Sequence, residues 1–221
     1  MFEPVIQDGL VYELLDKNNL DGAIDCVSKV FTTAEPLAHH LKISYEEFLV
    51  FARAYYPKVA ADGLSFVARD RQSGRVVGIR VSEDYVQEEA PDLDHISPKF
   101  FAIFTLLDQL SDHFKKIRRV EPGKYIHLFM VAVDEAYTNR GIAPTMNRFF
   151  FNYVKTLGFT HAATEPTGRI SQHVLRDKFG FKELHRIYYK DYEFDGEKVF
   201  ADIQGHDCAM LMEQSLSELG G

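Results

Sequence analysis

The sequence predicts an α/β protein, and three features of the 221-residue chain support this prediction. The run 125–133 is apolar on both faces apart from one histidine, as expected of a central strand covered on both sides. Strand and helix patterns alternate after this run. Before it, two β-rich runs flank a Gln-Ser-Gly turn and predict an antiparallel pair. Length and apolar content fit one domain over 1–221.

Local signals define the elements of the first half. Ser44 and Glu47 have the spacing of a capping box, which predicts the start of a helix. Pro57 and Gly63 are typical of the end of that helix. The predicted elements are a strand at 11–15, a helix at 20–31, a helix from 44 into the 57–63 region, strands at 64–69 and 76–81, and an acidic loop at 83–94.

The second half is assigned by the same kinds of signal. Apolar residues from Met146 to Leu157 form one helical stripe, and Gly158 lies where a C-terminal cap is expected. Pro144 is tolerated because an N–H in the first turn has no partner to lose. The predicted elements are a helix that opens at 97–98 and ends in the basic segment 115–119, the strand 125–133, the helix ending at 157, a strand at 160–164, a helix at 170–178, and strands at 181–189 and 209–212.

Residues 131–143 carry the central strand through a short polar turn into the start of a helix. The first turn of a helix has backbone N–H groups without internal partners, and the helix dipole places positive charge there. Gly141 and Ala143 are small enough to let an anion reach these amides. The junction therefore predicts a phosphate site, with a turn that binds nothing as the alternative interpretation.

The same junction resembles the signature of the GCN5-related N-acetyltransferases. Val133 ends the strand, Tyr137 is the aromatic residue, Gly141 and Ala143 complete the Gly-x-Gly/Ala pattern, and Thr138 replaces the usual Gln or Arg. The resemblance implies the acyl-CoA N-acyltransferase fold, a mixed central sheet flanked by helices, with acetyl-CoA as cofactor. The cofactor-binding residues that it implies are Met130, Val131, Ala132, Val133, Thr138, Asn139, Arg140, Gly141, Ile142 and Ala143.

A narrower resemblance extends over most of the chain. Lys178–Phe181 is similar to the Lys-x-Gly-Phe of the superfamily, and Ala34–Leu37 resembles the Glu-Pro-Leu of insect-type arylalkylamine and dopamine N-acetyltransferases. Pro98–Phe100, the region 189–200 and His206 fit the same order. This resemblance implies direct transfer of an acetyl group to a small primary amine of the arylalkylamine kind.

Transfer to an amine needs a base, because a primary amine is almost wholly protonated at neutral pH. The resemblance places this role on Glu35. Desolvation beside Phe31, Pro36 and Leu37 would raise the pKa of the Glu35 carboxyl and suit it to the role. The alternative interpretation is that Glu35 is a loop acid or caps the segment near His39.

The other catalytic groups are less defined by the sequence. Arg176 stands where many relatives carry the tyrosine that protonates the leaving thiolate, so Ser171 and Thr167 become candidates, with helix capping and a turn as their alternative roles. The resemblance also implies a splay or bulge in the central strand that frees an amide near Val131 to polarise the thioester carbonyl. His127, alone on an apolar strand, is predicted to be a hydrogen-bonded core group.

Composition excludes several classes of function. A net charge of −8 argues against a nucleic-acid partner, and no run of eighteen apolar residues or charged-then-apolar leader suggests a membrane span or secretion. The two cysteines have neither a disulfide framework nor metal-ligand spacing. We expect a cytoplasmic monomer or homodimer without a metal that acts on a small-molecule amine. Two alternatives stay open: a catalytically silent acyl-CoA-binding domain, and an acetyltransferase for a non-aromatic amine such as a polyamine.

Overall fold

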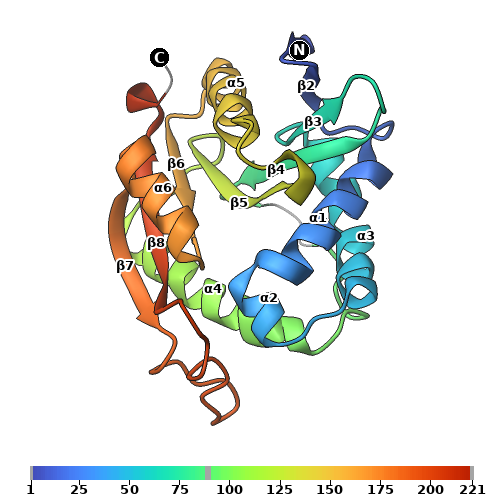
Figure 1. The fold of residues 1–221 in the computed structure, drawn as a ribbon. Coiled ribbons are helices and arrows are strands. Elements are labelled where there is room, and N and C mark those ends of the chain that lie inside the picture. Colours follow the sequence, from blue (N-terminus) through green and yellow to red (C-terminus); the bar gives the residue numbers. More distant parts are fainter. Residues whose placement is uncertain (1, 88–90, 220–221) are drawn as a thin grey trace.

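One mixed sheet organises the protein. A computed structural model describes residues 2–87 and 91–219, and its strands form one eight-stranded sheet in the order β1-β2-β3-β4-β5-β6-β8-β7 (Figure 1). Adjacent strands are antiparallel except β5 and β6, which are parallel. The strands are β1 (Val5–Gln7), β2 (Leu10–Leu14), β3 (Phe66–Asp70), β4 (Val76–Asp84), β5 (Tyr125–Val133), β6 (His161–Thr164), β7 (Lys182–Tyr188) and β8 (Cys208–Ser215). The predicted mixed sheet flanked by helices is confirmed.

Helices cover both faces of the sheet. On one face, α1, α3 and α4 bury residues such as Val27, Phe51 and Leu106, and on the other face α5 buries Met146 and Phe150. This separation follows from the apolar stripe of each helix. The helices are α1 (Leu20–Ala34), α2 (Pro36–His40), α3 (Tyr45–Asp62), α4 (Lys99–Ile117), α5 (Ile142–Thr156) and α6 (Arg169–Phe179), with short 3-10 helices at Glu135–Tyr137 and Leu216–Glu218.

Several predicted bounds needed correction. The capping box at Ser44 and the end of α3 at Gly63, which has a φ of 65°, are as predicted, but Pro57 does not end the helix and lies inside it. Proline removes one bond of the helical ladder, and the buried residues on both sides of it, Tyr56 and Val59, hold the helix together. Leu157, predicted on the apolar stripe of α5, lies beyond its last residue and is 48% exposed.

Other differences concern short elements and charged positions. β1 and α2 were not predicted, because three and five residues are too few to show a period. Glu83 and Asp84 lie in β4 and not in the predicted acidic loop, since Glu83 pairs with His127 across the ladder. Part of that loop, 88–90, lies outside the described residues. The final strand is longer than 209–212 because it pairs with both β6 and β7.

β5 separates from β6 partway along its length. The two strands pair only over residues 125–127 of β5 and 161–163 of β6, and the Thr164 hydroxyl then donates to the carbonyl oxygen of Leu128 at 2.8 Å. On its other edge β5 has a register shift against β4, between the pairs that join Leu128 with Ser82 and Met130 with Val81. The predicted splay and bulge in the central strand are thus both present, and they open the sheet at its middle.

Candidate active site

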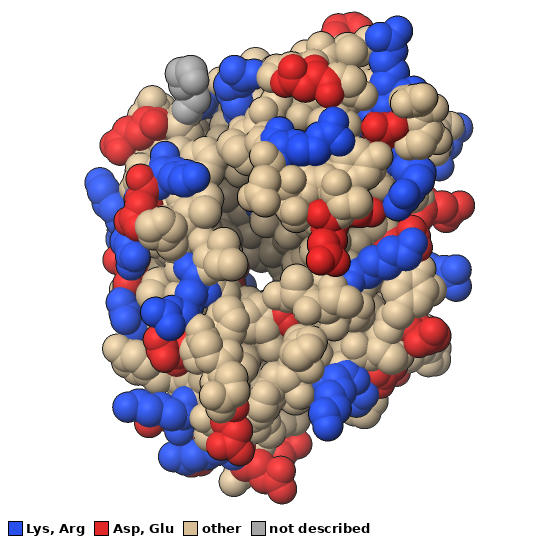
Figure 2. Space-filling view, viewed as in Figure 1, with Lys and Arg blue, Asp and Glu red and all other residues tan. Residues whose placement is uncertain are grey.

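The opening between β5 and β6 leads into a cavity of about 450 Å³. Figure 2 shows the hollow near the centre of this face of the molecule. Much of its lining is apolar and comes from α1, α3, α4 and β5, with Phe31, Phe48, Phe100, Ile103, Phe104, Leu107 and Phe129 among the lining residues. The polar side chains among its lining residues are Glu35, Arg80, Thr164, Glu165, Thr167, Ser171 and His206.

Glu35 lies at the break between α1 and α2, which it caps from both sides. Its amide donates to the Phe31 carbonyl at the end of α1, and its carboxylate accepts from the Ala38 amide at 2.6 Å at the start of α2. The second carboxylate oxygen accepts the Thr167 hydroxyl at 2.6 Å. Pro36 fits the first position of α2 because no N–H is needed there. The capping role considered from sequence is therefore real, and it fixes the carboxylate at the cavity wall.

The environment of Glu35 makes it more basic than an ordinary glutamate. Burial raises the pKa of the Glu35 carboxyl, and the hydrogen bonds from Thr167 and the α2 amides oppose this effect without cancelling it. A carboxylate with a raised pKa accepts a proton from an ammonium group more readily than one exposed to water. Glu35 combines this property with direct access to the cavity.

The two hydroxyl candidates have different surroundings. Thr167 does not serve a turn alone, because its hydroxyl donates to Glu35 and its carbonyl accepts from the Tyr189 hydroxyl at 2.6 Å. Ser171 is not a helix cap: Gly168 is the N-cap residue of α6, and the Ser171 hydroxyl donates back to the Gly168 carbonyl at 2.8 Å. Both residues line the cavity opposite β5.

The predicted cofactor residues of β5 lie along the opening. Met130 and Val131 line the cavity, and the edge of β5 that faces β6 has no ladder partner in the described sheet over 129–133. Ala132 is buried and Val133 half-buried on opposite faces of the strand. Amides along that free edge can donate to a carbonyl oxygen held in the opening, which is what an oxyanion site requires.

The turn that follows β5 presents unpaired amides. Asn139 and Gly141 both have left-handed backbones, with φ of 61° and 72°. Within the described part of the chain, the amides of residues 139–143 donate to no other residue. Thr138 uses its hydroxyl locally, on the Glu135 carbonyl at 2.9 Å, and the Arg140 guanidinium stacks 4.9 Å above the Tyr137 ring. The amides of 139–143, at the positive end of α5, are suited to bind an anion, and we call them the anion cradle.

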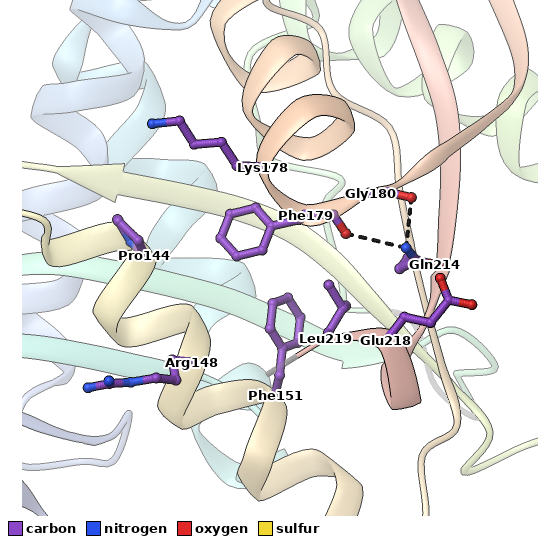
Figure 3. Close-up of a pocket in the computed structure, with 9 residues that line it drawn as sticks. All are labelled: Pro144, Arg148, Phe151, Lys178, Phe179, Gly180, Gln214, Glu218 and Leu219. Atoms are coloured by element: carbon purple, nitrogen blue, oxygen red, sulfur yellow. Dashed lines mark hydrogen bonds between the residues drawn. The ribbon is translucent and has the colours of Figure 1, made fainter. Parts of the chain in front are cut away.

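A second cavity of about 560 Å³ lies between α5, the end of α6 and the last strand (Figure 3). Arg148 and Lys178 bring positive charge to it, and Phe151 and Phe179 form apolar walls. Gln214 stays fixed at its edge through a bond of 2.7 Å to the Gly180 carbonyl. This second cavity adjoins the anion cradle at Pro144, which lies in the first turn of α5.

His127 belongs to a buried hydrogen-bonded network beside the cavity. Its two ring nitrogens lie 3.1 Å from a Glu83 oxygen and 2.6 Å from a Glu165 oxygen, and the hydroxyls of Tyr55 and Tyr85 donate to the same two carboxylates. Desolvation would lower the pKa of His127, but the two carboxylates outweigh it and raise the pKa to about 10. The prediction of a hydrogen-bonded core histidine is confirmed. Glu165, which lines the cavity, was missed because a loop acid has no sequence signal.

Other classes of site have little support in residues 2–87 and 91–219. Within these ranges no group of three or more His, Cys, Asp and Glu side chains is placed to hold a metal ion. Both cysteines are buried free thiols. In the same part of the chain, no helix has the length and apolar character that crossing a bilayer requires.

Comparison with known proteins identifies the fold. No family model matches the chain. The C-terminal condensation domain of Ebony, solved with β-alanyl-dopamine, is 20% identical, with a TM-score of 0.82 and coverage of 93% of this chain and 98% of that one. Arylalkylamine N-acetyltransferase 2 from Aedes aegypti is 20% identical, with a TM-score of 0.79 and coverage of 95% and 100%.

A third similar structure is the Drosophila melanogaster polyamine N-acetyltransferase that forms N-acetylagmatine, at 18% identity, with a TM-score of 0.74 and coverage of 93% and 99%. The protein therefore has the fold of the GCN5-related N-acetyltransferases, as the sequence predicted, and it resembles the insect arylalkylamine enzymes among them. The similarity extends over nearly the whole chain.

Proposed function

We propose that the protein is an acetyl-CoA-dependent N-acetyltransferase that transfers the acetyl group directly to a small primary amine of the arylalkylamine class. The observation that carries this proposal is the position of Glu35. A carboxylate with a raised pKa faces the same cavity as the free edge of β5, so a base and an oxyanion site share one space. The insect acetyltransferases of the same fold support the reaction type.

The chain has the features that coenzyme A needs. Among residues 2–87 and 91–219 the amides of 139–143 have no hydrogen-bond acceptor, and a Cβ placed on Gly141 would meet nothing within 4 Å, so the approach is open. Phosphates fit such a helix start because charge and hydrogen bonds act together. Met130 and Val131 line the way into the cavity and would flank the thioester end. When bound, acetyl-CoA would supply an acetyl group activated as a thioester.

Glu35 prepares the nucleophile. Its carboxylate attracts the ammonium form of the acceptor and takes one proton from it, directly or through a water, which leaves a lone pair on nitrogen. The neutral amine would form the new C–N bond as the C–S bond of the thioester breaks. The sulfur would take the bonding electrons, and the second proton that the nitrogen gives up on becoming an amide would balance the charge of the thiolate. Amides on the free edge of β5 donate to the carbonyl oxygen while it carries negative charge. We assign the return of a proton to sulfur to Ser171, whose side chain lines the same cavity.

The cavity walls favour an aromatic acceptor. The cavity is lined by five phenylalanines, Phe31, Phe48, Phe100, Phe104 and Phe129. Burial of an aromatic ring against such side chains is favourable. A second candidate is a dication such as a polyamine, because Glu165 adds a second carboxylate to the lining and the agmatine-acetylating enzyme shares the fold. The aromatic walls outnumber the acidic groups, so we place the arylalkylamine first.

A panel assay tests the proposal. The protein is supplied with acetyl-CoA and, in turn, phenethylamine, tryptamine, dopamine, agmatine and spermidine, and free thiol is measured. We expect kcat/KM to be highest for one of the aromatic amines. A higher value for agmatine or spermidine would move the assignment to the dication. Binding of coenzyme A without thiol release for any amine would instead identify a silent acyl-CoA-binding domain.

A further inference from the structure

Arg80 is a buried cation without a buried anion. The residue is 5% exposed, and its Nε and Nη2 both donate to the side-chain oxygen of Asn147, at 3.2 and 3.0 Å. No carboxylate of the described residues lies within ion-pair distance of its guanidinium. Burial lowers the pKa of Arg80 to about 10. Buried arginines are normally paired with acids, so this one calls for an explanation.

The third guanidinium nitrogen of Arg80 opens into the cavity. Arg80 lies on β4, opposite Val131 of β5, and lines the cavity together with Val131 and Ala143. Within the described residues Nη1 of Arg80 has no hydrogen-bond partner. Among the same residues, the Ser82 hydroxyl oxygen is the one fully buried side-chain N or O atom that lacks a partner, so Nη1 is not fully buried. Nη1 is therefore accessible from the cavity, and it is a free donor.

The surroundings of Arg80 are positive and lack a compensating acid. Asn147 lies four residues after Ala143 on α5, which is about one helical turn, or roughly 5–6 Å along the helix axis. Because Arg80 binds Asn147, its guanidinium lies about one turn along α5 from the anion cradle. The first turn of α5 contains no acidic residue, and its dipole adds positive charge. A ligand with an electronegative atom that binds beneath α5 would interact favourably with both the Arg80 guanidinium and the positive end of the α5 dipole.

We propose that Arg80 is a cofactor-positioning residue that donates from Nη1 to a carbonyl oxygen of the pantetheine arm of coenzyme A. This inference rests on the proposed function, since it concerns the same cofactor, but it adds a residue outside the signature that carries the resemblance. Asn147 holds the guanidinium in place, so Nη1 is already oriented to donate when the pantetheine arm binds in the opening. A guanidinium is suited to this role because it stays charged when buried.

The proposal predicts different effects on binding and on stability. Arg80→Met keeps much of the side-chain volume and removes the buried charge. Loss of an unpaired buried charge is favourable, whereas the buried Asn147 oxygen loses its donors; the two effects oppose each other, so Tm without ligand should change little. Loss of a hydrogen bond from a charged donor should weaken coenzyme A binding roughly ten- to a hundredfold. A purely structural arginine would instead lower Tm and leave the binding unchanged.

The experiment is isothermal titration calorimetry with coenzyme A and with two fragments of it, pantetheine and adenosine 3′,5′-bisphosphate, together with the Tm of the ligand-free protein. We expect Arg80→Met to weaken coenzyme A and pantetheine and to leave the bisphosphate unchanged. Arg69→Met is the matched control: it removes a half-exposed arginine of β3 that pairs with Glu13 of β2, and it should change none of the three affinities.

Other outcomes overturn the assignment. Unchanged coenzyme A binding in Arg80→Met rejects it, and weakening confined to the bisphosphate moves the contact to the phosphates. If Arg80→Met does not fold, Arg80→Lys keeps the charge but not the fork that holds Asn147, and it should weaken pantetheine binding; unchanged binding in this variant is again a rejection. Failure of the unaltered protein to bind coenzyme A would reject the proposed function itself, a result distinct from all of these.

Discussion

The Thr167 hydroxyl donates to the Glu35 carboxylate at 2.6 Å, although 132 residues separate the two in the sequence. The contact joins the α1–α2 break to the loop between β6 and α6, and both residues line the cavity. It holds the carboxylate in one orientation and stabilises its charged form. Through this bond the wall beside β6 influences the basicity of the candidate base.

Replacing Glu35 should test the base most directly. Glu35→Gln keeps the size and an oxygen that can accept from Thr167 or Ala38, but it cannot take a proton. We expect kcat/KM to fall roughly 10²- to 10⁴-fold. We also expect the acidic limb of the pH profile, in which kcat/KM rises as the base loses its proton, to disappear. The measurement is a pH profile of kcat/KM with the best amine of the panel.

The control for this substitution is binding of coenzyme A, which should not change because Glu35 is not among the residues to which we assign the cofactor. An acidic limb that persists unaltered in Glu35→Gln would remove Glu35 from the role of base. Glu165 would then be the next carboxylate of the cavity to replace.

Thr167→Val should move the same acidic limb. The Thr167 hydrogen bond lowers the pKa of Glu35, so its loss raises that pKa further. A base must be deprotonated to act, and the limb should therefore shift to higher pH, with kcat/KM at neutral pH falling roughly three- to tenfold. Thr33→Val, on the exposed surface of α1, is the control. A shift toward lower pH would contradict the role given to this bond.

Sequence reasoning found the parts of the site that depend on local pattern. The apolar run 125–133, the stripe that begins at Met146 and the small residues at the start of α5 each have a period or a turn preference that a single chain reveals. The fold followed from the order of such segments. These features need no knowledge of distant contacts.

The parts that were missed depend on contacts between distant segments. Thr167 was predicted as a possible proton donor to sulfur, and its bond to Glu35 appears only when β6 and α1 are brought together. Arg80 has the sequence context of an ordinary exposed strand residue, and its burial is set by Asn147 of α5, 67 residues away. Glu165 likewise gains its partners from distant segments, Tyr85 just after β4 and His127 of β5.

His127 should make stability depend on pH. Its pKa is raised to about 10, above the value near 6.5 of an unfolded histidine, so the folded state binds the proton more tightly. The stabilisation is fully present below pH 6.5 and is lost as pH rises toward 10. Urea unfolding between these values should show a falling free energy of unfolding that is not seen in His127→Gln.

The same variant should be destabilised at neutral pH by about 3–5 kcal/mol, because it leaves Glu83 and Glu165 buried without a cation. His173→Gln, at an exposed position of α6, is the control and should leave the free energy of unfolding nearly unchanged. Equal stability of His127→Gln and the unaltered protein at pH 7 would mean that the network carries no charge.

A pair of glycine substitutions separates cofactor binding from backbone strain. Gly141 and Gly123 both have a φ of 72°, and a Cβ on either would meet nothing within 4 Å. Valine at either position must adopt a left-handed backbone, which costs about 1–3 kcal/mol. Gly141→Val and Gly123→Val should therefore lower Tm by similar amounts. Their effects on coenzyme A should differ, because the amide of Gly141 belongs to the anion cradle whereas Gly123 precedes β5.

We expect Gly141→Val to weaken coenzyme A binding at least tenfold, since the branched side chain at the start of α5 fills space that a phosphate would occupy and disturbs the amides of 139–143. Gly123→Val should bind coenzyme A as the unaltered protein does. The measurement is calorimetry below the Tm of both variants. Equal weakening in the two would attribute the effect to general destabilisation, and no weakening in Gly141→Val would place the phosphates away from this turn.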